Sequence, residues 1–256
     1  MRASPDTQYA TDANLRARQR LWETSPQEPA FSLYPWVLAL ADLRGGERIL
    51  DVGCGNGGYL ALVEATGLDL SIGMLAAARE RTSGPLVCGD VQRLPFPTGW
   101  FDLVLAPHML YHVPDRVAAA RELRRVLRTG GRCIAVTNSG RIHWEMVGLV
   151  EDVVGHGWRM QRPSNVAFSL ENGADQLRTA FEQVERVDAP PVVFSVTDVD
   201  AFAAYIASIG DHYEDEVSAW RTWHEVVEEC RHRAAGIIDE QGAFRISTAV
   251  GAFVCS

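Results

Sequence analysis

The chain has 256 residues, of which 47% are hydrophobic and 22% charged, and its formal net charge is −9. This is an ordinary globular composition, and the acidic balance argues against nucleic acid as a partner, because nucleic-acid affinity rests largely on Lys and Arg. No run approaches the ~18 apolar residues that a membrane span needs, so we expect neither a membrane partner nor a signal peptide.

The five cysteines are odd in number, far apart and never spaced as Cys-x-x-Cys. Such spacing predicts neither a zinc site nor a disulfide framework. We therefore expect no metal centre. A cytoplasmic location fits these residues best, because a reducing compartment keeps thiols unpaired.

Residues 1–44 are expected to form two helices ahead of the first core strand. Thr11 or Asp12 is a suitable N-cap for the first helix, and the second spans about 31–43. From residue 45 onward, strands and helices alternate, which predicts a doubly wound, mostly parallel α/β sheet. The expected strands are 48–52, 66–69, 86–88, 101–105 and 132–137, and the expected helices start at 57 and cover 71–81 and 115–127.

The pattern loosens after Asn138. Residues 140–168, rich in Gly, Trp and His, are interpreted as a lid, and 190–242 as an inserted helical cap. A helix over 171–181, a strand over 184–187 and a closing strand over 244–254 are also expected. The chain is therefore predicted to have three parts. Residues 1–44 form an N-terminal helical segment that covers the site, residues 45–138 form the ligand-binding core, and residues 139–256 complete the sheet.

The stretch from Ile49 to Gly58 is typical of a short buried strand that runs into a glycine-rich turn. Such a turn at the C-terminal edge of a parallel sheet forms a cradle for nucleotide-like ligands. The spacing Gly53-x-Gly55-x-x-Gly58 also fits a dinucleotide site, so the turn alone leaves two ligand classes open. Asp51 favours a cationic ligand, because its carboxylate would repel a pyrophosphate but suits the sulfonium and ammonium groups of S-adenosyl-L-methionine.

Five segments in order resemble the motifs of class I S-adenosylmethionine-dependent methyltransferases, of the small-molecule type with a methyltransferase 11 domain. They are Asp51 to Gly57, Gly67 to Ser71 with Met74, Cys88 to Val91, Phe101 to Ala106 running into His108, and Glu122 to Leu127 with Gly130-Gly131. The resemblance covers roughly residues 45–138. It implies a Rossmann-like sheet of seven strands, with an antiparallel last strand and S-adenosyl-L-methionine as the cofactor. Only eleven residues separate Gly57 from Asp69, so the helix from 57 must be short, or the next strand reduced.

The motifs also imply which residues bind the cofactor. Gly53 and Gly55 are expected to contact it, with Asp51 holding its ammonium group directly or through water. Asp69 ends a strand opposite the turn, where a carboxylate can accept both ribose hydroxyls. A helix N-cap is the structural alternative for Asp69, although Ser71 suits that role better.

The resemblance assigns further cofactor contacts to Leu70, Met74, Asp90, Val91 and Ala106. Asp90 would accept a hydrogen bond from the adenine amino group, and the Ala106 backbone would lie near the methionine portion. The alternatives are a turn aspartate for Asp90 and a core methionine for Met74. By analogy with an N-terminal helix that closes over the cofactor, Tyr9 is placed at the methionine carboxylate.

His108 follows the fourth strand, at the rim where a methyl acceptor would sit, and is the candidate catalytic residue. A general base is needed only if the acceptor is protonated. We therefore expect a cytoplasmic enzyme that methylates O or N of a small molecule, such as a secondary metabolite, with its oligomeric state open. The alternatives are an RNA methyltransferase, an NAD-dependent oxidoreductase, and a protein that binds the cofactor without an acceptor.

Overall fold

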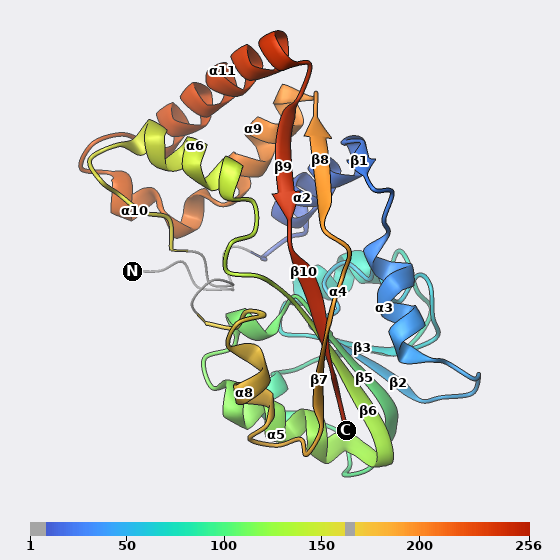
Figure 1. Ribbon diagram of the computed structural model, residues 1–256. Coiled ribbons are helices and arrows are strands. Elements are labelled where there is room, and N and C mark those ends of the chain that lie inside the picture. The colour runs from blue at the N-terminus through green and yellow to red at the C-terminus, as the bar shows by residue number, and fades with distance from the viewer. Residues whose placement is uncertain (1–8, 162–166) are drawn as a thin grey trace. The chain divides into compact units, whose positions relative to one another are not determined.

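The computed structural model describes residues 9–161 and 167–256, and these divide into two compact units (Figure 1). The core unit consists of the described parts of Ser32–Arg141, Arg162–Ala189 and Ala249–Ser256. The helical unit consists of the described parts of Met1–Phe31, Ile142–Gln161 and Pro190–Thr248. Both units are thus discontinuous in sequence, whereas the sequence-based division uses three continuous segments.

A seven-stranded sheet forms the centre of the core unit, in the order β4-β3-β2-β5-β6-β10-β7. The strands are β2 (Ile49–Val52), β3 (Thr66–Asp69), β4 (Leu86–Cys88), β5 (Phe101–Pro107), β6 (Leu127–Asn138), β7 (Val184–Asp188) and β10 (Val250–Cys255). Neighbours from β4 to β6 pair in parallel, and β10 is antiparallel to both β6 and β7. The expected doubly wound, mostly parallel sheet with an antiparallel last strand is confirmed.

Apolar clusters cover both faces of this sheet because side chains alternate along each strand. Leu50 and Val52 of β2 belong to one cluster, and Ile49 belongs to the other. The first cluster includes the buried residues of α5, and the second includes those of α3. The helices of this unit are α3 (Leu33–Ala41), α4 (Ile72–Ala78), α5 (Arg116–Val126), α8 (Gly173–Leu177) and the short 3₁₀ helices Val91–Arg93 and Leu110–His112.

The helix expected from residue 57 is wrong. Residues 54–65, all described, contain turns but no helix, although single helix-like hydrogen bonds run from the Ala61 N–H to the Gly57 carbonyl and from Val63 to Tyr59. Strand β3 keeps its full length, so the short spacing removes the helix rather than the strand. Adjacent glycines at 57 and 58 also weaken a helix start. The helix expected over 171–181 is likewise reduced to Gly173–Leu177.

The helical unit contains a small antiparallel sheet in the order β1-β8-β9, together with several helices. Its elements are α2 (Ala13–Thr24), β1 (Gln27–Glu28), α6 (Trp144–Val154), β8 (Val192–Val196), α9 (Val199–Ser208), the 3₁₀ helix Gly210–His212, α10 (Glu214–Val217), α11 (Trp223–Gln241) and β9 (Phe244–Thr248). The expected lid therefore contains a regular helix. The single closing strand expected over 244–254 is wrong, because the strand breaks at Ala249: β9 pairs with β8 in one sheet and β10 with β6 and β7 in the other.

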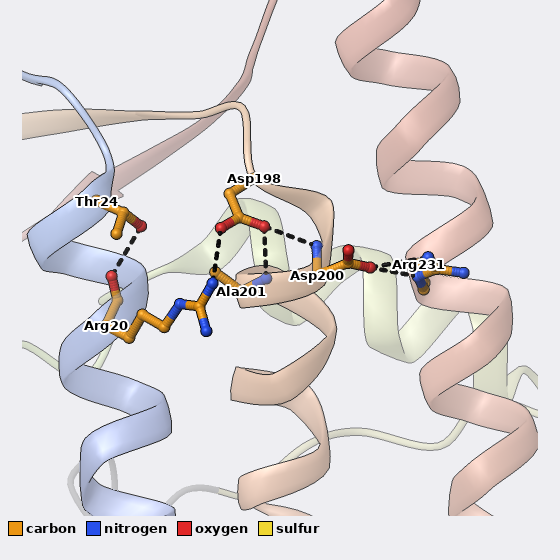
Figure 2. A network of polar contacts seen from close by, with 6 residues as sticks. All are labelled: Arg20, Thr24, Asp198, Asp200, Ala201 and Arg231. Atoms are coloured by element: carbon orange, nitrogen blue, oxygen red, sulfur yellow. Dashed lines mark hydrogen bonds and ion pairs between the residues drawn. The ribbon is translucent and has the colours of Figure 1, made fainter.

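Polar contacts join α2, α9 and α11 within the helical unit (Figure 2). Asp198 is the N-cap of α9, and its carboxylate accepts hydrogen bonds from the backbone N–H groups of Asp200 and Ala201 at 3.0 and 2.9 Å. Arg20 lies 3.5 Å from the other Asp198 oxygen, and Arg231 of α11 binds Asp200 at 2.8 Å. These ion pairs are exposed and contribute little to stability, whereas the cap satisfies backbone donors.

We expect Asp198→Ala to lower the free energy of unfolding by about 1 kcal/mol, because it leaves the first N–H groups of α9 unpaired. Arg20→Ala is the matched control and should cost less than about 0.5 kcal/mol, because it removes only an exposed ion pair. Urea unfolding of both variants measures the difference. An equal loss in the two variants would contradict the assignment of the stabilising role to the cap.

Candidate cofactor site

The carboxyl ends of the central strands form the candidate site. From β2 the chain continues to β3 and β4 on one side, whereas β5 and β6 lie on the other side of β2. The β2–β5 boundary is therefore a topological switch point, where open α/β sheets bind their ligands. The glycine turn follows β2, Asp69 ends β3, and His108 follows β5, so the sheet brings these predicted residues to one edge.

The glycine turn has the backbone conformation that its sequence predicts. Gly53, Gly55 and Gly57 have φ values of +66°, +54° and +84°, a region that only glycine adopts readily. The N–H groups of Gly53 and Cys54 both donate to the Leu68 carbonyl, at 2.7 and 3.0 Å, which fixes the turn against β3. A Cβ added to Gly53 would lie 2.7 Å from the Cβ of Met109, so the turn is closely approached by the segment after β5.

Asp69 holds the turn from the neighbouring strand. Its carboxylate accepts hydrogen bonds from the backbone N–H groups of Gly55 and Ser71, both at 2.9 Å. Burial raises the pKa of Asp69, although the hydrogen bonds from Ser71, Gly55 and Leu70 oppose the increase. Ser71, the residue better suited to the N-cap role, caps α4 by accepting from the Met74 N–H, so the N-cap alternative for Asp69 does not hold. Each carboxylate oxygen keeps a further lone pair that can accept a ligand hydroxyl.

Asp51 is completely buried in the middle of the sheet, on the strand that leads into the turn. Neither of its carboxylate oxygens has a hydrogen-bond partner among the described residues. Burial raises the pKa of Asp51 to about 8, and the charge of Asp69 adds to the increase. A buried carboxylate without a partner is costly, so Asp51 is the strongest electrostatic indication of a ligand-binding role in this unit.

The other predicted cofactor contacts differ in their exposure. Leu70 is 54% exposed at the end of β3, whereas Met74, Val91 and Ala106 are almost fully buried. These three residues belong to the buried core, and their expected contacts with a cofactor stay predictions. Asp90 accepts hydrogen bonds from the backbone and side-chain amides of Gln92, both at 2.8 Å, which is the geometry of a turn aspartate.

His108 has an unusual backbone conformation for a residue with a side chain, with φ at +54°. Its backbone N–H donates to the Val136 carbonyl at 2.9 Å, which anchors it to β6. Burial lowers the pKa of His108 to about 4, so the imidazole is neutral near pH 7. Strained backbone of this kind often occurs at functional sites. The 3₁₀ helix begins only at Leu110, so His108 lies in the connection between β5 and that helix.

Tyr9 belongs to the helical unit, where its hydroxyl accepts a hydrogen bond from Arg18 at 3.3 Å. The guanidinium carbon of Arg18 also lies 5.9 Å from the centre of the Tyr9 ring. The expected contact of Tyr9 with the methionine carboxylate stays a prediction.

Sequence reasoning missed two residues of the core unit that bear on the site. Met109 contacts Gly53, as described above. Tyr59 follows the glycine turn, and its hydroxyl is buried without a hydrogen-bond partner among the described residues. Nothing in the local sequence indicates either feature, because both depend on segments that meet only in the folded sheet.

Within residues 9–161 and 167–256, no group of three or more His, Cys, Asp or Glu side chains is arranged to hold a metal ion. No helix in the same ranges is long and apolar enough to cross a membrane. All five cysteines are free thiols, and only Cys88 is exposed.

Comparison with known proteins agrees with this arrangement of strands and turns. Residues 50–135 match the family model described as a methyltransferase domain. This stretch begins in β2 and ends in β6, so it contains the glycine turn, Asp69, Asp90 and His108. Residues 50–135 are therefore similar to a methyltransferase domain. The wider core unit adds the antiparallel strands β7 and β10 to this matched stretch.

Curated relatives match part of the chain and not its whole length. A malonyl-acyl-carrier-protein O-methyltransferase of Legionella pneumophila is 41% identical over 104 residues, which cover 36% of this chain and 36% of the relative. A demethylmenaquinone methyltransferase of Staphylococcus epidermidis is 36% identical over 115 residues, which cover 40% of this chain and 48% of the relative. The matched stretch thus spans half or less of the length of these relatives.

Solved structures with the same fold extend the likeness beyond this domain. A protein from Anabaena variabilis, assigned as a methyltransferase of an antibiotic biosynthesis pathway, has a TM-score of 0.60 at 15% identity and covers 87% of this chain and 96% of its own. The cyclase SpnF has a TM-score of 0.55 at 24% identity and covers 88% of this chain and 79% of its own. At these identities the likeness concerns the fold alone.

Proposed function

We propose that the protein is a cytoplasmic S-adenosyl-L-methionine-dependent methyltransferase that transfers a methyl group to O or N of a small molecule. The observation that carries the proposal is the unpaired, fully buried Asp51 carboxylate beneath a glycine turn, in a chain whose residues 50–135 match a methyltransferase domain. A cytoplasmic setting agrees with five free thiols. The acidic balance of the chain favours a small acceptor over RNA.

The residues of the site fit this cofactor by their chemistry. Asp51 offers a carboxylate without a cation, which suits an ammonium or sulfonium group and repels a pyrophosphate. Asp69 offers carboxylate oxygens at the end of β3, which suit ribose hydroxyls, and Leu70 offers an exposed apolar surface beside it. The glycines of the turn have no side chains to block the approach of a ligand to their backbone.

Bound S-adenosylmethionine supplies an activated methyl group on its sulfonium. The protein then has to hold donor and acceptor in line, and such positioning accounts for most of the acceleration in a displacement of this kind. Asp69 fixes both the turn and the ligand side of β3 through its hydrogen bonds to Gly55 and Ser71. His108 is held neutral near pH 7, so it can accept a proton from an O–H or N–H acceptor.

The acceptor side is assigned to the helical unit. Three segments that lie outside the motif series, within 1–31, 142–161 and 190–248, gather into this one compact unit. Its interior is rich in aromatic rings. The centroid of the Trp22 ring lies 4.5 Å from that of the His143 ring and 4.9 Å from that of the Phe194 ring. Such a unit suits an acceptor with apolar or aromatic character.

We expect His108→Asn to lower kcat for an O–H or N–H acceptor by about a hundredfold or more, because it removes the base. Asn tolerates the left-handed backbone conformation that His108 adopts, so the fold is preserved. The neutral, base-competent form of His108 exists above its pKa of about 4. The acidic limb of the rate profile should therefore lie near pH 4 rather than 6.5. Cofactor affinity, measured by calorimetry, is the control and should change little.

Two measurements test the proposed function directly. Calorimetry should detect binding of S-adenosylmethionine, and a fluorescence titration should detect no binding of NADH. Transfer of a labelled methyl group is then sought across a panel of small O–H and N–H acceptors and RNA. Binding of NADH but not S-adenosylmethionine would overturn the proposal, and transfer to RNA alone would replace the acceptor class.

A further inference from the structure

The interior of the core unit contains a second unpaired polar side chain near Asp51. Tyr59 is 5% exposed and lies in the apolar cluster that includes Ile49 of β2. Side chains two apart on a strand share a face, so Asp51 points to the same side of the sheet as Ile49. The Tyr59 hydroxyl and both Asp51 oxygens have no hydrogen-bond partner among the described residues. Two unpaired hydrogen-bonding groups therefore lie on one apolar face beside the glycine turn.

The charge of Asp51 acts on Tyr59 electrostatically. Burial raises the pKa of the Tyr59 phenol, and the nearby charges of Asp51 and Tyr34 add to the increase. Of the other groups close by, Asp69 on β3 acts on Asp51, and burial followed by Asp51 and Asp69 raises the pKa of Cys54. No cationic side chain contributes to any of these shifts. This region of the described core unit thus has two carboxyl groups and a phenol, and no cationic side chain acts on them.

Packing holds the Tyr59 ring in place. The rings of Tyr34 and Tyr59 are 4.7 Å apart at 64°, an edge-to-face arrangement. Tyr34 also lies over Gly58, where an added Cβ would meet its ring and hydroxyl. A hydroxyl on a fixed ring loses little further entropy when it binds a ligand group. Leaving it unpaired in the interior is unfavourable, so a ligand that supplies hydrogen-bond donors is favoured here.

We propose that Tyr59, together with Asp51, makes the cofactor site selective for ligands that carry an amino group. This inference rests on the proposed function and adds a specificity residue to it. An ammonium group has three N–H donors: one suits the Asp51 carboxylate and another suits the phenol oxygen. The O–H of Tyr59 then remains to donate to Asp51. Tyr59 is a positioning residue, because it orders the amino-acid end of the ligand rather than the reacting methyl group.

The test compares two ligands that share the adenosine portion. S-adenosylhomocysteine carries the amino group, and 5′-methylthioadenosine does not. In calorimetry at pH 7.5, Tyr59→Phe should weaken S-adenosylhomocysteine binding by about tenfold or more, the loss typical of one hydrogen bond to a charged group. It should change 5′-methylthioadenosine binding by less than about twofold. Tyr205→Phe, a buried tyrosine of the helical unit, is the matched control and should alter neither.

The outcomes separate the inference from the function on which it rests. Equal losses for both ligands, or none for either, would overturn the role of Tyr59 while leaving the cofactor site intact. If the unaltered protein binds neither ligand, the proposed function fails as well. A second experiment needs no substitution: it compares the affinities of the unaltered protein for S-adenosylhomocysteine and for the deaminated analogue of this ligand. The unaltered protein should bind the analogue at least about tenfold more weakly, and equal affinities would contradict amino-group selectivity.

Discussion

Binding of S-adenosylmethionine is expected to release a proton and to tighten as the pH rises from 6 to 7.5. Burial holds the pKa of Asp51 near 8 in the folded protein, so its carboxyl is protonated below that value. An ammonium group needs the ionised form, so binding displaces the proton. Affinity should then rise by up to about tenfold per pH unit in this range. Calorimetry in buffers of different ionisation enthalpy measures the protons released.

Asp51→Asn provides the matched control for this linkage. The variant has no carboxyl to ionise, so its ligand affinity should be weak and independent of pH over the same range. 5′-Methylthioadenosine, which lacks the ammonium group, should release no proton from either protein. A constant affinity between pH 6 and 7.5 with no proton release would contradict the pairing of Asp51 with the ammonium group.

The same residue should make the stability of the ligand-free protein depend on pH. The folded pKa of about 8 lies above the ordinary value of 3.8, so the folded state binds this proton more tightly than the unfolded state does. The resulting stability is fully present below about pH 4 and is lost as the pH rises through 8. At pH 8.5 the free energy of unfolding of Asp51→Asn should therefore exceed that of the unaltered protein by an amount on the order of a few kcal/mol. The variant should also have the higher melting temperature at this pH. Both differences should shrink towards pH 5.

Asp69→Ala is expected to weaken S-adenosylmethionine binding by about a hundredfold, the equivalent of two hydrogen bonds to a charged group. The carboxylate has two tasks, because it is placed to accept ribose hydroxyls and also accepts the N–H groups of Gly55 and Ser71. Its removal therefore takes away ligand contacts and loosens the glycine turn. Calorimetry at pH 7.5 measures the loss.

Asp102→Ala is the matched control for this prediction. Asp102 lies near the start of β5, at the opposite edge of the same sheet, and binds Arg48 and Arg128. Its loss should lower stability without changing ligand affinity. Asp69→Asn should fall between the unaltered protein and Asp69→Ala, because the amide oxygen still accepts one hydrogen bond. Unchanged affinity in Asp69→Ala would refute the ribose assignment.

Local patterns in the sequence determined the α/β core. Strand runs and glycine turns have short-range signatures, and the carboxyl ends of parallel strands must meet at one edge. The sequence alone therefore placed Gly53, Asp69 and His108 near one another. The sequence-based prediction was wrong for the helix from residue 57. Only eleven residues separate Gly57 from Asp69, and these include both the connection from the glycine turn and the start of β3.

Only the tertiary structure decided the features that depend on burial and on distant segments. Asp51 precedes the turn in the sequence, but its complete burial and the absence of a partner among the described residues arise from β3, β5 and the cluster around Tyr59. The break at Ala249 between two sheets has no local signal, because each half pairs with strands far away in the chain. Desolvation and strand pairing are properties of the assembled sheet. They decide how deeply Asp51 is buried and which groups surround the glycine turn.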